Sequence, residues 1–179
     1  MVFLTIIEWE PLTCPKGFQK MEHQGHEFCY KPGQVTYQQS KDLCNSNGLS
    51  LVEVDSEAKS VALDSIASKW SVNTWFWFGL VCPTGTNSCN RDLNLWQWER
   101  SKKMLSATSG YKKRLYLSSG SIYGGGNAEY CIHWWKKPGV WAPQPCTLPT
   151  HMNTMCERVM WASRKDMPNI YDEKKDFYC

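Results

Sequence analysis

Four consecutive aromatic residues open the stretch Trp75-Phe76-Trp77-Phe78-Gly79-Leu80. Aromatic residues favour extended backbone, because their rings pack well on a pleated and partly covered surface. The stretch therefore predicts a central strand of a sheet, and the rest of the chain is interpreted as elements arranged around it.

A first helix is expected before this strand, over residues 35–45 (VTYQQSKDLCN), directly after a Pro-Gly turn. Tyr37, Lys41 and Cys44 recur there at spacings of four and three, which is the period of one helix face. The spacing predicts that Cys44 faces the core. Gly48 is expected to end the helix, since glycine is a common helix terminator.

The segment 49–54 (LSLVEV) alternates well enough between apolar and polar residues to predict a short strand. Ser56 then offers an N-cap for a second helix, which is expected to run through Lys69. Beyond the central strand turns dominate, and residues 101–128 show little periodicity. A structureless stretch of that length is typically a functional loop or disordered.

The cysteines are spread over the whole chain and form no Cys-x-x-Cys pairs of the kind that a structural zinc site uses. The nine are Cys14, Cys29, Cys44, Cys82, Cys89, Cys131, Cys146, Cys156 and Cys179. The pattern predicts a disulfide framework and hence a secreted or extracellular protein. No signal peptide is visible at the start of the sequence, so on this expectation it has been removed, truncated or replaced.

Composition excludes several classes of function. The chain of 179 residues suits one domain with its own core, and its net charge of +3 is too small to indicate binding to nucleic acid or to a membrane surface. No run of eighteen apolar residues occurs, so we expect no membrane span. No Gly-x-Ser-x-Gly, His-Glu-x-x-His or phosphate-loop motif occurs either, and we expect no enzyme.

Taken in order, seven motifs resemble those of a C-type lectin-like domain of the long form. They are Cys14-Pro15-Lys16-Gly17-Phe18 with Cys29-Tyr30, Cys44 followed by Gly48-Leu49-Ser50-Leu51-Val52, Trp77-Phe78-Gly79-Leu80, Trp96-Gln97-Trp98, Glu129-Tyr130-Cys131, Gly139-Val140-Trp141 with Cys146, and Cys156-Glu157. The resemblance implies an α+β fold, with two helices flanking antiparallel sheets, a long loop region and stapling disulfides. It divides the chain into an N-terminal extension (1–13), the domain (14–157) and a C-terminal tail (158–179).

The resemblance also implies three bridges, Cys14–Cys29, Cys44–Cys156 and Cys131–Cys146. Cys82 and Cys89 flank a turn-rich segment and are expected to close a small fourth loop. Cys179 is left over. Cys179 has two interpretations. It forms an intermolecular bridge that links an oligomer, or it is an unbridged C-terminal thiol.

Sugar-binding members of this family hold calcium through oxygen ligands, and the ion contacts the sugar. Here Glu129 matches one ligand position. The upstream triplet position holds Ser121-Ile122-Tyr123, and the position of a Trp-Asn-Asp motif holds Trp141-Ala142-Pro143. Alanine supplies no side-chain oxygen and proline only its carbonyl, so we expect no calcium in this site, no assigned metal ligands and no cofactor. Calcium elsewhere in the fold stays an open alternative.

A basic segment offers a different ligand surface. Between positions 100 and 128 the chain has six basic residues and no acidic one, with tyrosines interleaved. An acidic partner would gain salt-sensitive attraction from such a cluster and contact area from the tyrosines, whereas the plain alternative is an ordinary solvated loop. The candidate ligand-binding residues are Lys102, Lys103, Tyr111, Lys112, Lys113, Arg114, Tyr123, Glu129 and Trp135.

The sequence therefore predicts an extracellular recognition module that binds a protein or an acidic, non-standard glycan without the usual calcium-dependent sugar site. A lectin with a remodelled carbohydrate site is the alternative within binding modules. A structural matrix or coat component, crosslinked through Cys179, is the alternative from another class.

Overall fold

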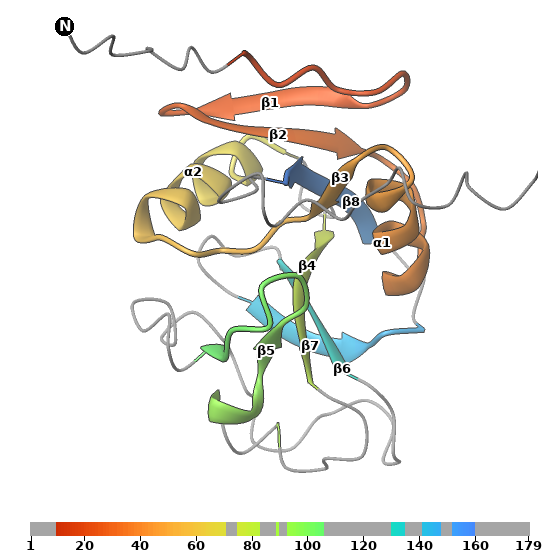
Figure 1. The fold of residues 1–179 in the computed structure, drawn as a ribbon, viewed down its shortest axis with the longest axis vertical. Helices are drawn as coiled ribbons and strands as arrows, with labels where there is room; N and C mark the ends of the chain where they lie inside the picture. The colour runs from red at the N-terminus through yellow and green to blue at the C-terminus, as the bar shows by residue number, and fades with distance from the viewer. Residues whose placement is uncertain are drawn as a thin grey trace, which may run out of the picture.

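The computed structural model describes residues 10–70, 75–82, 89, 93–105, 130–134, 141–147 and 152–159. In chain order the elements are β1 (Gln19–His23), β2 (His26–Lys31), α1 (Tyr37–Asn45), β3 (Leu49–Leu51), α2 (Glu57–Ala67), β4 (Trp75–Cys82), η1 (Leu93–Leu95), β5 (Gln97–Trp98), β6 (Tyr130–Trp134), β7 (Trp141–Pro145) and β8 (Met152–Arg158). The β1–β2 hairpin lies at one end, β5, β6 and β7 lie at the other, and the two helices flank the strands between them (Figure 1). None of the helices within these described ranges is long and apolar enough to cross a membrane.

The predicted central strand is confirmed. The main path of the sheet is β1-β2-β8-β4-β6-β7, with β3 attached to β8 and β5 to β4. Strand β4 runs antiparallel to β5 and β6 and parallel to β8. The α+β class with two flanking helices is also confirmed, and the parallel β4–β8 pair makes the sheet mixed where the sequence predicted antiparallel pairing.

Both predicted helices are present, each with a side-chain cap. Helix α1 begins after Thr36, whose hydroxyl accepts from the Gln39 backbone N–H at 3.2 Å while the Gln39 amide oxygen accepts from the Thr36 N–H at 2.9 Å. This reciprocal capping box satisfies backbone donors that the first helical turn leaves unpaired. In α2 the Ser56 hydroxyl accepts from the Lys59 N–H at 3.2 Å, as predicted, and the helix ends at Ala67, two residues before its expected limit.

The predicted strand over 49–54 is shorter in the structure, where β3 ends at Leu51. The reason is a change of hydrogen-bond partner. The Glu53 N–H donates to a side-chain oxygen of Glu157 at 3.0 Å, so it is not part of a strand ladder. Gly48 lies just before β3 with a φ of 69°, a left-handed conformation that glycine adopts without steric cost.

All four predicted intramolecular bridges are present: Cys14–Cys29, Cys44–Cys156, Cys82–Cys89 and Cys131–Cys146. The second fastens α1 to β8, as the inward placement of Cys44 predicted. The fourth joins β6 to the residue that follows β7. Cys179 lies outside the described residues.

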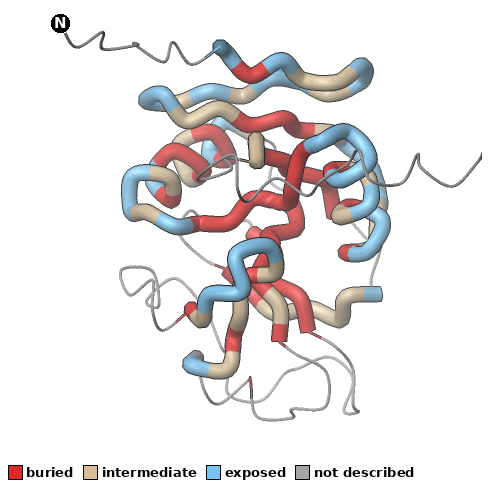
Figure 2. The backbone as a smooth tube through the Cα atoms, viewed as in Figure 1, coloured by how far each residue is buried: buried red, intermediate tan, exposed pale blue. Residues whose placement is uncertain are grey.

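Alternate side chains of β4 enter two different clusters of buried residues. Phe76, Phe78 and Leu80 pack in the larger cluster with residues of α2, β5 and β7, whereas Trp77 packs in the second cluster against α1. Buried backbone accordingly runs through the middle of the molecule, with exposed segments at its margins (Figure 2). Because β4 is covered on both faces, its unbroken apolar sequence is explained.

Candidate ligand-binding site

Two of the candidate ligand-binding residues, Lys102 and Lys103, fall within the described part of the chain, and both are exposed. The others lie outside it: Tyr111, Lys112, Lys113, Arg114, Tyr123, Glu129 and Trp135. The structure therefore places the beginning of the basic segment, which is the turn that follows β5.

That turn closes a narrow hairpin. The Trp98 N–H donates to the Lys103 carbonyl at 2.8 Å, and the Leu105 N–H donates to the Trp96 carbonyl at 2.8 Å. Within the turn the Gln97 side chain donates to the Lys102 carbonyl at 2.9 Å, and Lys102 has a φ of 57°. These bonds across both arms fix the backbone from which Lys102 and Lys103 project. We call residues 96–105 the basic hairpin.

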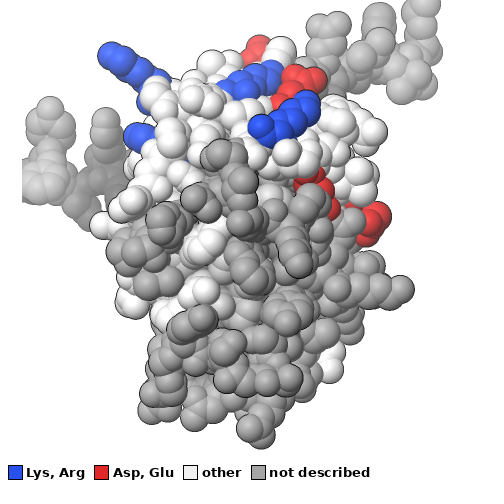
Figure 3. Space-filling model, turned by 180° about the vertical axis from the view of Figure 1, so that it is seen from behind, with Lys and Arg blue, Asp and Glu red and all other residues white. Residues whose placement is uncertain are grey.

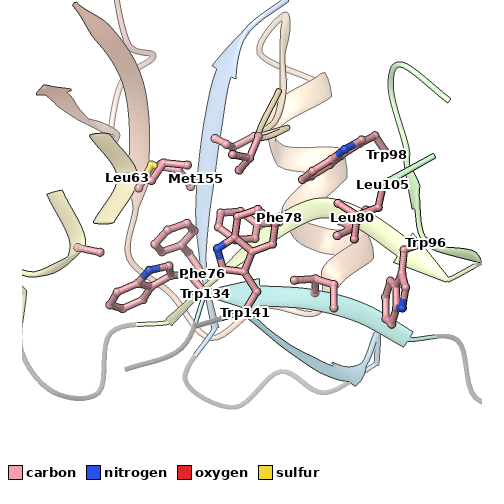
Figure 4. Close-up of a cluster of buried hydrophobic side chains, with 14 of the residues drawn as sticks. Leu63, Phe76, Phe78, Leu80, Trp96, Trp98, Leu105, Trp134, Trp141 and Met155 are labelled. Atoms are coloured by element: carbon pink, nitrogen blue, oxygen red, sulfur yellow. The ribbon is translucent and has the colours of Figure 1, made fainter. Parts of the chain in front are cut away.

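The base of the basic hairpin is part of the hydrophobic core. Trp96, Trp98 and Leu105 are buried, and they share a cluster with Leu80 of β4 (Figure 4). The Trp98 ring also contacts the Trp141 ring edge-on, with centroids 6.2 Å apart. Large rings lose few rotamers on burial, so they make a stiff base for the exposed turn.

A buried carboxylate holds the tip of the basic hairpin. Glu53 is only 3% exposed, and its Oε1 accepts from the backbone N–H groups of Arg100 and Ser101 at 2.6 and 3.0 Å. Hydrogen bonds to a charged acceptor are stronger than neutral ones. In the sequence Glu53 is one polar position of the alternating segment 49–54. A glutamate inside the run Leu-Val-Glu-Val was the available indication that this position is buried and paired.

Arg100 is one of the six basic residues of the segment 100–128. Its guanidinium bonds mainly to other side chains of the same molecule. Its guanidinium donates to the Ser50 hydroxyl at 2.9 Å and pairs with Glu157 at 3.1 Å and Glu53 at 3.6 Å. Its side chain is 31% exposed. The exposed positive charge of the basic hairpin therefore comes chiefly from Lys102 and Lys103.

Glu157 is the centre of a charge network. Its two carboxylate oxygens pair with Arg100 and with the Lys59 ammonium, which lies 2.9 Å from Oε2. Lys59 also donates to the Glu53 carbonyl at 2.9 Å and to Asp55 at 3.0 Å. Burial raises the pKa of Glu157 above its ordinary value, and the two cations oppose that rise. Removing either cation would leave the buried Glu157 carboxylate with one positive charge fewer to balance it.

Of the positions where sugar-binding members of the family carry calcium ligands, Ala142 and Pro143 lie in β7, whereas residues 121–123 and Glu129 lie outside the described residues. Ala142 of β7 is opposite His133, and Pro143 is opposite Ile132. Trp134 is buried, and its indole N–H donates to Asp64 of α2 at 3.1 Å. His133 is also buried, which lowers its pKa to about 3. No group of three or more His, Cys, Asp or Glu side chains that could hold a metal ion occurs among the described residues.

Two solved structures with a similar fold are carbohydrate-recognition domains of a cow and a human protein. The carbohydrate-recognition domain of cow CD23, solved in the presence of a GlcNAc2Man3 oligosaccharide, is 18% identical with a TM-score of 0.55, covering 83% of this chain and 98% of that one. The carbohydrate-recognition domain of the human scavenger receptor C-type lectin is 15% identical with a TM-score of 0.52, covering 83% of this chain and 100% of that one.

A third similar structure is the C-type lectin domain of the murine dendritic cell inhibitory receptor 2 in complex with an N-glycan. It is 17% identical with a TM-score of 0.50, covering 80% of this chain and 97% of that one. No curated protein sequence matches the chain. The family model of the lectin C-type domain matches residues 33–158, which is more than half of the chain. The chain therefore belongs to the lectin C-type domain family.

Proposed function

We propose that this domain is an extracellular recognition module that binds an acidic partner, a non-standard acidic glycan or a protein, without the calcium-dependent sugar site. The observation that carries the proposal is the basic hairpin. It is anchored by buried tryptophans and by Glu53, and it presents Lys102 and Lys103 to solvent. A preformed charged turn loses little entropy on binding, which favours its use as a contact surface.

The independence from calcium is supported by β7. A hard cation needs several oxygen ligands, and this strand offers Ala142 and Pro143 where the family pattern has asparagine and aspartate. Glu129 alone would supply one carboxylate. In the proposal Glu129 is a polar contact to the ligand, and no metal or cofactor takes part.

The acidic character of the partner is supported by the charge distribution. At the end formed by β1 and β2, basic and acidic side chains lie beside one another (Figure 3), and Lys20 pairs there with Glu22 and Glu27. The segment 100–128 has no acidic residue at all. In the proposal Lys112, Lys113 and Arg114 extend the charge of the basic hairpin, while Tyr111, Tyr123 and Trp135 add contact area.

Retention on a heparin column tests this function. The Lys112/Lys113/Arg114→Ala variant is expected to elute at lower salt than the wild type, because fewer cations contact the sulfates. The Lys16/Lys69→Ala variant removes charges from two exposed positions elsewhere and is the control for a general loss of positive charge. Equal elution of the two variants would contradict the proposal.

A lectin with a remodelled carbohydrate site is the second candidate. It is favoured by the cow CD23 structure, solved in the presence of an oligosaccharide, and by the murine receptor domain in complex with an N-glycan. Under this candidate neutral glycans bind, and retention on heparin does not depend on Lys112, Lys113 and Arg114.

The extracellular location belongs to the proposal and is supported by the four bridges, since disulfides persist in oxidising compartments. An oligomer linked through Cys179 belongs to it as well. Non-reducing gel electrophoresis tests that linkage, because a covalent dimer is expected to disappear in the Cys179→Ser variant.

A further inference from the structure

A pocket of about 530 Å³ opens beside the basic hairpin, on a part of the fold away from the β6–β7 positions discussed above. Its walls come from α1, from β3 and from the turn that carries Lys102. Leu49 and Leu51 are among the lining residues but are buried in the second cluster, and Asn45 and Ser50 contribute polar atoms. The volume falls within the range of small-ligand sites, and it is large enough for a disaccharide.

The charged groups of this pocket carry one positive charge in excess. The basic side chains are Lys41, Arg100 and Lys102, and the acidic ones are Glu53 and Glu99. Each carboxylate already has donors of its own. Glu53 accepts from the Arg100 and Ser101 N–H groups, and Glu99 accepts from the Tyr37 hydroxyl and the Lys41 ammonium.

The cations are the more accessible charges. The Lys41 and Arg100 side chains are each 31% exposed and Lys102 is an exposed residue, whereas the Glu99 side chain is 23% exposed and Glu53 is 3% exposed. An entering anion would therefore meet ammonium and guanidinium groups before it met a carboxylate. Arg100 is held in place by Ser50 and Glu157, so little side-chain entropy is lost when it binds.

A second pocket, of about 500 Å³, has the opposite balance. It lies near the N-terminal side of α2, and its lining includes four acidic side chains against three basic ones, Lys59, Arg100 and Arg158. Arg100 lines both pockets. An anionic ligand is therefore favoured in the pocket beside the basic hairpin and disfavoured in this one.

We propose that the pocket beside the basic hairpin is a binding site for the sulfate or carboxylate group of an acidic saccharide. Lys41, Arg100 and Lys102 contact the anionic group, and Ser50 and Asn45 bond to hydroxyls. This inference rests on the proposed function, because it assumes an acidic glycan as the ligand. It goes further by naming a site that is formed within the described residues and requires no calcium.

Isothermal titration of the full chain with a sulfated heparin-derived disaccharide, in the presence of chelator, tests the site. Lys102→Gln is expected to weaken binding about tenfold, as one lost charged contact would. Asn45→Trp, which fills the exposed rim with a large ring, is expected to abolish binding without changing any charge. Lys69→Gln removes one charge from an exposed position at the end of α2, and its affinity is expected to stay within about twofold of the wild type.

The unsulfated, carboxylate-bearing disaccharide identifies the anion. Binding of both disaccharides assigns the site to either group, and binding of the sulfated one alone assigns it to sulfate. Equal affinities of Lys102→Gln and Lys69→Gln, or undiminished binding to Asn45→Trp, would overturn the proposal. Absence of disaccharide binding to the wild type would also overturn it. Retention of the same protein on long-chain heparin would then show that the proposed function stands without this pocket.

Discussion

Replacing Lys59 with methionine removes the ammonium that three oxygen atoms surround. The Lys59 side chain is 12% exposed and Glu157 is 7% exposed, so solvent screens their attraction only weakly. Breaking a buried ion pair by removing one partner costs about 3 to 5 kcal/mol. Arg100 remains 3.1 Å from Glu157 in the variant, so we expect the lower end of that range, about 3 kcal/mol.

The loss of stability caused by Lys59→Met should depend on pH. Burial already raises the pKa of Glu157 in the folded state, and removing Lys59 raises it further. A group with a raised folded pKa stabilises the fold at low pH, and that stabilisation is lost as the pH rises through the folded pKa. The deficit of Lys59→Met relative to the wild type is therefore expected to be largest at neutral pH and to shrink as the solution is acidified.

Urea unfolding followed by tryptophan fluorescence, with the disulfides intact, measures both effects. Lys69→Met is the matched control, because it makes the same chemical change at an exposed position of the α2 end, and we expect a change below about 0.5 kcal/mol. A loss of stability in Lys59→Met no larger than that of the control would show that the Lys59 ammonium does not stabilise the fold. A full deficit that persists unchanged in acid would refute the role assigned to Glu157.

Two further predictions concern stability. The Cys44–Cys156 bridge spans 112 residues, and its removal should lower the free energy of unfolding by about 5 kcal/mol. The Cys82–Cys89 bridge spans 7, and its removal should lower that free energy by about 2.5 kcal/mol. Thermal unfolding of the two double-alanine variants compares these losses. Burial lowers the pKa of His133 to about 3, from an ordinary histidine pKa of 6.5. The stability that the buried neutral ring confers is therefore present above pH 6.5 and is lost as the pH falls from there toward the folded pKa. Urea unfolding measures how far the free energy of unfolding falls between pH 7 and pH 5. This fall should be about 2 kcal/mol smaller for His133→Phe than for the wild type. Equal falls in the two proteins would contradict the burial of a neutral His133 ring.

The elements that local sequence patterns determine were predictable. The capping serine of α2, the inward face of α1 at Cys44 and the aromatic strand β4 each depend on neighbouring residues, and each is confirmed. The four bridges followed from the family resemblance together with one turn-rich loop. Spacing alone leaves many pairings open.

The contacts that shape the basic hairpin could not be predicted in this way. Glu53 and Arg100 are separated by 47 positions, and no periodicity links them. In the sequence Arg100 counts as one more cation of a basic segment, whereas in the fold its guanidinium pairs with Glu157. The parallel pairing of β4 with β8 is likewise a long-range arrangement that no turn signal specifies.

A glycan array probed with calcium and then with chelator, at two salt concentrations, tests whether the domain recognises an acidic ligand without calcium. We expect calcium-independent recognition, with binding to sulfated or carboxylated glycans that is unchanged by chelator and weakened by salt. Chelator-sensitive binding to neutral sugars would contradict it, because Ala142 and Pro143 would then stand in a working calcium site.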